Sequence, residues 1–217
     1  MNYKKIVLIL LLSNATGMLQ AQVPVVEEPR HKKVLENDYV RLLDVHLAPG
    51  DTSLYHIHAT PSVIVFLSQS VMGAEVMAGQ SQLPARVYPQ QVLYMDYAAK
   101  PVTHRVYNDS SNVFHVMDIE LVKTSASPDA CTLLQQQNLT TAIEEQLVNV
   151  YKLDIEPNQS LTIPAGHCAY LLICIAGEIE TTKKMAAGDF LFFTPGNKIP
   201  LINKQNTKAS FVLLALK

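Results

Sequence analysis

The 217-residue sequence contains no tryptophan, only eight glycines and only 17% charged residues, with a formal net charge of −2. It also contains no run of five residues that carry the same charge. General nucleic-acid binding needs clustered lysine and arginine to neutralise phosphates, so this composition argues against that role. Hydrophobic residues make up 48% of the chain, which is enough to form the core of one large domain or two small ones.

Cysteine is scarce, with Cys131, Cys168 and Cys174 only. An odd number means that at least one thiol is free or pairs with another chain. Cys168 and Cys174 fall six residues apart on one expected strand, about 20 Å by strand rise, which is too far for a bridge. A bridge from Cys131 to another strand stays open, but the sequence favours three small buried thiols.

No apolar run approaches the roughly 20 residues that span a bilayer. Near the N-terminus, Lys4 and Lys5 precede seven apolar residues, Ile6–Leu12, and the small residue Ala21 follows after a polar stretch. A basic start, a short apolar run and a small residue before the cut are typical of a signal peptide. The sequence therefore predicts a signal peptide at 1–21, export to the periplasm or the extracellular space, and no stable membrane anchor after its removal.

Beyond a proline-containing leader predicted at 22–33, the pattern is that of short strands. Runs rich in branched and aromatic residues alternate with turn residues, which is typical of an all-β barrel or sandwich. The expected strands are Val40–Leu47, Ser62–Leu67, Arg86–Tyr97 and Val113–Val122. Residues 124–139 break this pattern and are predicted to be a linker, in which Asp129 could cap a short helix over Cys131–Gln137.

The strand pattern repeats. A shift of 108 positions places Val148–Pro157 on Val40–Pro49, and Tyr170–Ile175 on Ser62–Leu67. A shift of 98 positions places Asp189–Phe193 on Gln91–Met95. The sequence therefore predicts two copies of one unit, at 34–123 and 140–217.

Three of the seven histidines form a metal-ligand pattern. His56 and His58 lie two residues apart on an expected strand, so that both imidazoles point to the same face. His104 follows 46 residues later. Neutral imidazole is a common nitrogen ligand for transition metals, and three such ligands leave coordination positions open.

The residues around these histidines resemble the cupin family. Gly50 followed by His56-Ile-His58 matches the start of that family's first motif, G-x5-HxH-x3,4-E-x6-G, and His104 with Asn108 matches the H-x3-N core of the second. The resemblance implies two tandem cupin-type barrels (double-stranded β-helix, or jelly roll). It also implies that His56, His58 and His104 bind one divalent transition metal ion: zinc, manganese, nickel or iron. Ser62 stands where the family has its glutamate ligand, which reduces the negative charge of the site.

The second copy lacks the ligands. Under the 108-position shift His56 falls on Pro164, His58 on Gly166 and Ser62 on Tyr170, and Pro200 and Ile202 lie near the third position. The second barrel is therefore expected to bind no metal and to serve a structural purpose.

Further polar residues on the expected strands could line a pocket. Ser62, Tyr94, Asp96 and His115 are candidate pocket residues, His115 being also expected as a buried, hydrogen-bonded residue. His31 in the leader and His46 on its strand are expected to be solvated.

Three functions remain: a metal-dependent enzyme such as a dioxygenase or isomerase, a small-ligand binding or sensing protein, and a structural protein whose histidines are remnants. A small molecule is the expected partner in the first two. The sequence identifies no catalytic residue, no substrate and no oligomeric state.

Overall fold

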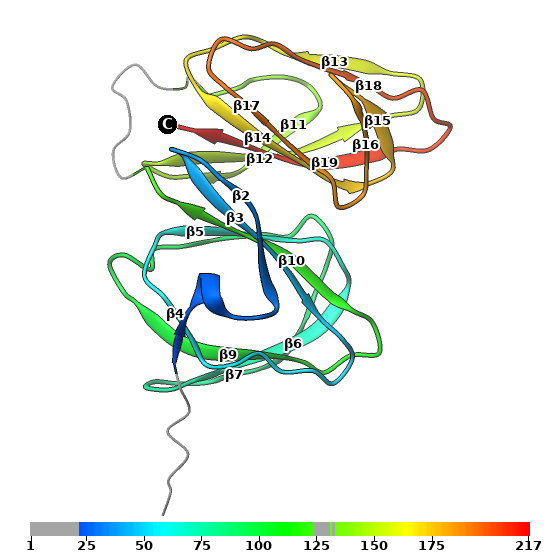
Figure 1. The fold of residues 1–217 in the computed structure, drawn as a ribbon. Helices are drawn as coiled ribbons and strands as arrows, with labels where there is room; N and C mark the ends of the chain where they lie inside the picture. The colour runs from blue at the N-terminus through cyan, green and yellow to red at the C-terminus, as the bar shows by residue number, and fades with distance from the viewer. Residues whose placement is uncertain (1–21, 124–130, 132) are drawn as a thin grey trace, which may run out of the picture.

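The computed structural model describes residues 22–123, 131 and 133–217, and it consists of two β-barrels that lie one against the other (Figure 1). The first barrel contains β1 Val23–Pro24, η1 Val25–Glu27 (a 3₁₀ turn), β2 His31–Glu36, β3 Val40–Leu47, β4 His56–His58, β5 Ser62–Phe66, β6 Ser70–Val76, β7 Gln82–Val87, β8 Val92–Met95, β9 Val102–Asn108 and β10 Phe114–Leu121. The second barrel contains β11 Leu139–Glu144, β12 Val148–Ile155, β13 Ser160–Ile163, β14 Ala169–Ala176, β15 Glu178–Glu180, β16 Lys184–Ala186, β17 Phe190–Phe193, β18 Ile199–Ile202 and β19 Ala209–Leu216.

Each barrel is built from two sheets with matching strand orders. In the first barrel one sheet runs β2-β3-β10-β5-β8, which we call its docking sheet, and the other runs β1-β4-β9-β6-β7. The second barrel has a docking sheet β11-β12-β19-β14-β17 and an outer sheet β13-β18-β15-β16. Strands β3 and β12 are related by the 108-position shift over their whole length, and the expected all-β, two-barrel fold is confirmed.

The two docking sheets pack against each other. Their outward faces are apolar and form one buried cluster, which includes Leu42, Val63 and Ile119 from the first barrel and Leu171 and Leu214 from the second. Burial of apolar surface on this scale is the main stabilising contribution to folding, so the interface is part of the core of the molecule. Figure 1 shows β2, β3, β5 and β10 on the side of the first barrel that faces the second.

The barrel interiors differ. The interior of the second barrel is filled by large side chains, among them Tyr151, Phe211, Tyr170 and Met185. The first barrel has apolar side chains on part of its inner wall, such as Val45, Phe66 and Val116, but it encloses a cavity as well. The cavity with room for a ligand that we describe below therefore lies in the first barrel.

The expected leader is part of the first barrel. β1 pairs in parallel with β4, and β2 pairs with β3, so that both ends of the segment 22–33 lie in the sheets of the barrel. The prediction of a separate leader was wrong because its two prolines fall at a strand end and in a turn, where a missing N–H is tolerated. The predicted signal peptide, 1–21, lies outside the described part of the chain. Within the described part, no helix is long and apolar enough to cross a membrane.

The segment after the first barrel is only partly described, since residues 124–130 and 132 lie outside the described part. Within 131 and 133–137 no helix forms, so the expected helix is not found there. Cys131 forms a disulfide with Cys168, with their Cα atoms 5.4 Å apart, and Cys174 is a buried free thiol. The preference for three free thiols was therefore wrong. Cys131 and Cys168 lie on segments that are distant in the sequence, and residue spacing along one strand does not show which distant segments the fold brings within disulfide distance.

Candidate metal centre

The HxH pair and His104 meet on two adjacent strands. β4 pairs antiparallel with β9, and His56 lies directly opposite His104 in the register. Strand alternation turns His58 to the same inner face as His56. The ring centroids are 4.9 Å apart for His56 and His58, 4.8 Å for His56 and His104, and 5.0 Å for His58 and His104.

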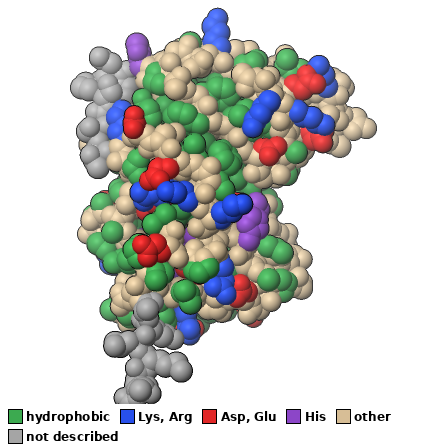
Figure 2. All heavy atoms as spheres, in the orientation of Figure 1, with side chains coloured by type: hydrophobic (Ala, Val, Ile, Leu, Met, Phe, Trp, Pro, Cys, Tyr) green, Lys and Arg blue, Asp and Glu red, His purple; other side chains and the backbone are tan. Residues whose placement is uncertain are grey.

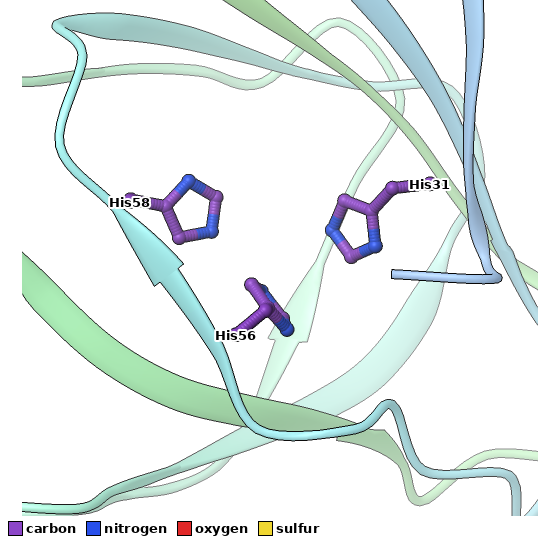
Figure 3. Close-up of side chains that lie close together, drawn as sticks. All are labelled: His31, His56 and His58. Atoms are coloured by element: carbon purple, nitrogen blue, oxygen red, sulfur yellow. The ribbon is translucent and has the colours of Figure 1, made fainter. Parts of the chain in front are cut away.

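A fourth imidazole, that of His31, joins this group from β2. His31 is buried, and its ring centroid lies 4.6 Å from that of His56 and 6.3 Å from that of His58. One ring nitrogen each from His31, His56 and His58 lies within 4.8 Å of the others, which is close enough for the three to hold a metal ion. Figure 3 shows the three rings pointing into one shared space. The expectation that His31 is solvated was wrong, because the chain before β2 pairs with β4 through β1 and brings His31 into the barrel.

Hydrogen bonds orient two of these rings, those of His56 and His31. Nδ1 of His56 lies 2.9 Å from the carbonyl oxygen of Leu54, and Nδ1 of His31 lies 2.7 Å from Oε2 of Glu28. A carbonyl oxygen only accepts, so Nδ1 of His56 donates and its Nε2 keeps a free lone pair. Nε2 of His56 is buried and has no hydrogen-bond partner. A neutral imidazole with Nδ1–H donated to an oxygen is the usual form of a metal-binding histidine.

Glu28 anchors His31. Its side chain is only 1% exposed and also accepts from the backbone N–H groups of Arg30 at 2.6 Å and of Leu54 at 3.0 Å. Burial by itself would raise the pKa of Glu28, but the hydrogen bonds from His31 and the backbone outweigh it and lower the pKa to about 2. Arg30 in turn donates twice to Asp51, at 2.7 Å each. The segment that carries His31 is therefore held by charge-assisted hydrogen bonds.

The electrostatics favour neutral rings. Burial lowers the pKa of His56 to about 3, helped by the nearby His31 and His104. Burial, followed by the charge of His31, lowers the pKa of His104 to about 4. For His58 the same burial lowers the pKa still further. At neutral pH the three rings are uncharged, which is the form that binds a metal ion.

Two more polar side chains, which the sequence analysis did not single out, border the site. Oδ2 of the buried Asp118, on β10, lies 3.5 Å from Nδ1 of His58. Burial and the nearby Glu120 raise the pKa of Asp118 to about 7. The ring of Tyr97 stacks on His58 with centroids 4.7 Å apart, and burial raises the pKa of its hydroxyl. Asp118 lies on β10 and Tyr97 lies in the turn after β8, but neither stands in a motif that marks it in the sequence.

The four imidazoles open onto the cavity of the first barrel, which has a volume of about 640 Å³. Its walls are mainly apolar, and the four histidines are among its polar side chains. The apolar wall includes Val45, Ile64, Phe66, Met72, Leu93, Met95, Phe114 and Val116, and the polar part includes Tyr97, Thr103 and Asp118. A pocket of this size and make-up suits a small organic molecule.

The candidate pocket residues of the sequence do not line this cavity. Ser62 is buried and its hydroxyl donates to the carbonyl oxygen of Thr60. Tyr94 packs against the interface between the barrels, and Asp96 is exposed and accepts from the backbone N–H of Ala99. His115 lies on the outside of the barrel, half-buried. On β8 the inward positions are Leu93 and Met95, so the parity chosen for Tyr94 and Asp96 pointed away from the cavity.

The second barrel has no such cluster among its described residues. Asn203 holds the turn after β18 much as Asn108 holds the turn after β9, so the position four residues before each is equivalent. That position is His104 in the first barrel and Ile199 in the second, and the paired residue across the strand is His56 in the first and Ile163 in the second. Two isoleucines, which cannot bind a metal, therefore replace the two histidines.

Comparison with known proteins identifies similar folds but no close relative. No family model matches the sequence, and no curated protein matches it. Several solved structures are similar in fold. Bacterial pirin YhhW from Escherichia coli in complex with nickel(II) is 13% identical with a TM-score of 0.60, and the match covers 86% of this chain and 90% of that one.

Two further structures are similar to a comparable degree. Salicylate 1,2-dioxygenase from Pseudoaminobacter salicylatoxidans is 9% identical with a TM-score of 0.58, over 82% of this chain and 68% of that one. Oxalate decarboxylase from Lactobacillus farciminis is 8% identical with a TM-score of 0.60, over 83% and 78% respectively. These are cupin-family proteins, and at such identities the likeness establishes the cupin-type fold and nothing finer.

Proposed function

We propose that the first barrel binds one divalent transition metal ion through His56, His58 and His104, with His31 as a further nitrogen donor. The observation that carries the proposal is the convergence of four imidazoles, one with a buried, unpartnered Nε2. An unpaired polar atom in a buried site costs free energy, which a bound ion would offset. Nitrogen donors without a carboxylate favour nickel or zinc over the harder manganese.

The chain's residues would prepare the site in three ways. The backbone and Glu28 orient His56 and His31, and the apolar wall excludes water from the region beside the imidazoles. A ligand in the cavity would place an apolar body against that wall and its oxygen or thiolate atoms toward the histidines. A bound ion would act there as a Lewis acid.

Turnover of the bound molecule is the first candidate activity, since Asp118 places a buried carboxyl group in the same cavity wall. The similar solved structures named for a dioxygenase and a decarboxylase support this class of function. Binding without turnover is the alternative, and uptake of oxygen with a candidate substrate would separate the two. Export of the chain through residues 1–21 is part of the proposal, and it favours zinc or nickel over iron(II), which oxidises readily outside the cell.

Metal content tests the proposal. We would purify the chain without a histidine tag or chelator, measure bound metals by mass spectrometry, and compare His56→Ala/His58→Ala with His167→Ala, which removes an exposed histidine of the second barrel. The expected result is about one ion per chain in the parent and in His167→Ala, and almost none in the double variant. A double variant that keeps the metal would overturn the assignment of the site. So would a parent that takes up no metal after reconstitution.

A further inference from the structure

A second histidine cluster lies on the outside of the first barrel. Asp44 and His46 are two residues apart on β3, and His115 on β10 lies directly opposite His46 in the register. Strand alternation therefore turns all three side chains to the outward face of the docking sheet, away from the cavity. Oδ1 of Asp44 lies 2.8 Å from Nε2 of His115 and 3.7 Å from Nδ1 of His46.

The cluster occupies the rim of the interface between the barrels. Along the same outward face, Leu42 and Met117 are buried in the interface, and Asp44, His46 and His115 follow where the sheet emerges from it. The turn between β16 and β17 borders the cluster, since a Cβ built on Gly188 would lie 3.8 Å from Cε1 of His115. In the space-filling view, histidine surface appears on the first barrel next to its junction with the second (Figure 2).

The geometry is that of a ligand set. One oxygen and two nitrogens, one from each residue, all lie within 4.8 Å of one another. In tetrahedral zinc sites the metal–ligand bonds are about 2.0–2.2 Å long, so ligand atoms are about 3.3 Å apart. The 2.8 Å and 3.7 Å separations bracket that value, and small rotations of the side chains would equalise them.

The surroundings hold the side chains in place without filling the site. The rings of His46 and His115 stack with centroids 3.9 Å apart, and the side chains of Asp44 and His115 are 25% and 21% exposed. His46 is 51% exposed, which leaves a path for an ion and for water as a fourth ligand. Lys32 lies opposite Asp44 on β2 and its positive charge opposes binding of a cation, which sets the affinity below that of a fully buried site.

We propose that Asp44, His46 and His115 form a second metal site, independent of the barrel cavity, that binds zinc or a similar borderline divalent ion. Two imidazole nitrogens and one carboxylate oxygen with an open position suit such an ion. Because the ligands join β3 and β10 at the edge of the interface, a bound ion stabilises the folded chain through its binding free energy.

Titration with Zn²⁺ alone, against a competing indicator, tests the proposal. The parent is compared with His46→Ala/His115→Ala, with His56→Ala/His58→Ala, and with His167→Ala as a control for an exposed histidine. We expect about two equivalents in the parent and the control, and about one in each double variant. In addition, Lys32→Gln should strengthen binding at the weaker site several-fold by removing the opposing charge.

The outcomes separate the two proposals. If the parent binds one equivalent that only His46→Ala/His115→Ala removes, the surface site stands and the cavity site fails. If His46→Ala/His115→Ala keeps both equivalents, or if Lys32→Gln leaves the affinity unchanged, the surface site is wrong. Because His46 is mainly exposed, His46→Ala alone serves as a variant expected to fold like the parent, checked by its circular dichroism, and it must also weaken the second equivalent.

Discussion

At the scale of single residues, the cavity histidines depend on the groups that hold their other ring nitrogen. His56 is oriented by a backbone carbonyl, which no substitution removes. His31 is oriented by Glu28, which is buried and can be changed. Partners of this kind set the tautomer and the basicity of a ligand, and their loss commonly lowers metal affinity about 10- to 100-fold.

Glu28→Gln should therefore weaken metal binding about 10- to 100-fold while preserving the shape of the side chain. The amide keeps an oxygen that can accept from His31, but it removes the negative charge. A metal titration of the variant measures the effect, and Glu36→Gln at the exposed end of β2 is the control. Unchanged affinity in Glu28→Gln would show that the charge of Glu28 does not contribute to metal binding.

Sequence reasoning reached some of these residues and not others. His56, His58 and His104 could be chosen because a two-residue spacing on a strand and a motif on the next strand are visible along the chain. His31 could not, because its position depends on the pairing of β1 with β4, a contact between segments with no spacing rule. Glu28 followed by Arg30 and His31 was the available signal, but short charged clusters of this kind are common on surfaces.

At the scale of elements, the two turn asparagines show how one unit was reused. Nδ2 of Asn108 donates to the carbonyl oxygens of Leu47, Ala48 and Asn112 at 3.1, 3.1 and 2.7 Å. Nδ2 of Asn203 donates to the carbonyl oxygens of Ile155 and Thr207, both at 2.9 Å. Each asparagine thus ties the end of one strand to the turn after a strand of the docking sheet.

Asn108→Ala and Asn203→Ala should each destabilise the chain by about 1–3 kcal/mol, because each leaves buried carbonyl groups without donors. Only Asn108→Ala should also weaken metal binding, since Asn108 ends the strand that carries His104. Urea unfolding followed by circular dichroism gives the first quantity and metal titration gives the second. Equal metal affinities in the two variants would mean that the turn does not position His104.

The repeat could be read from the sequence where strands are regular and buried. β3 and β12 keep the same length and the same turn after them, so a constant shift aligns them. The shift fails elsewhere because loops differ in length: the residue equivalent to His104 is Ile199, not one of the positions first considered near Pro200 and Ile202. Which face of a strand points inward could not be predicted either, since alternation alone does not say which side of β8 faces the cavity.

At the scale of the whole molecule, the docking sheets bury both faces of their central strands. On β14, Leu171 packs into the interface between the barrels and Leu172 packs into the interior of the second barrel, and both are fully buried. The second barrel therefore supplies one side of the buried interface against which the first barrel packs. From this arrangement we infer that the two barrels unfold together.

Leu172→Ala tests this inference because it removes buried side-chain volume on the face of β14 away from the first barrel. It should destabilise the chain by about 2–5 kcal/mol, and the loss should extend to the first barrel. Hydrogen exchange of peptides from β10 and β14 during urea unfolding should show one common midpoint, lowered equally in both. Leu171→Asp should instead separate the two midpoints. A buried carboxylate destabilises the interface between the barrels, whereas the interior of each barrel is left unchanged. If Leu172→Ala lowers only the β14 midpoint, the barrels are independent units, and the second barrel does not stabilise the fold that holds the histidines.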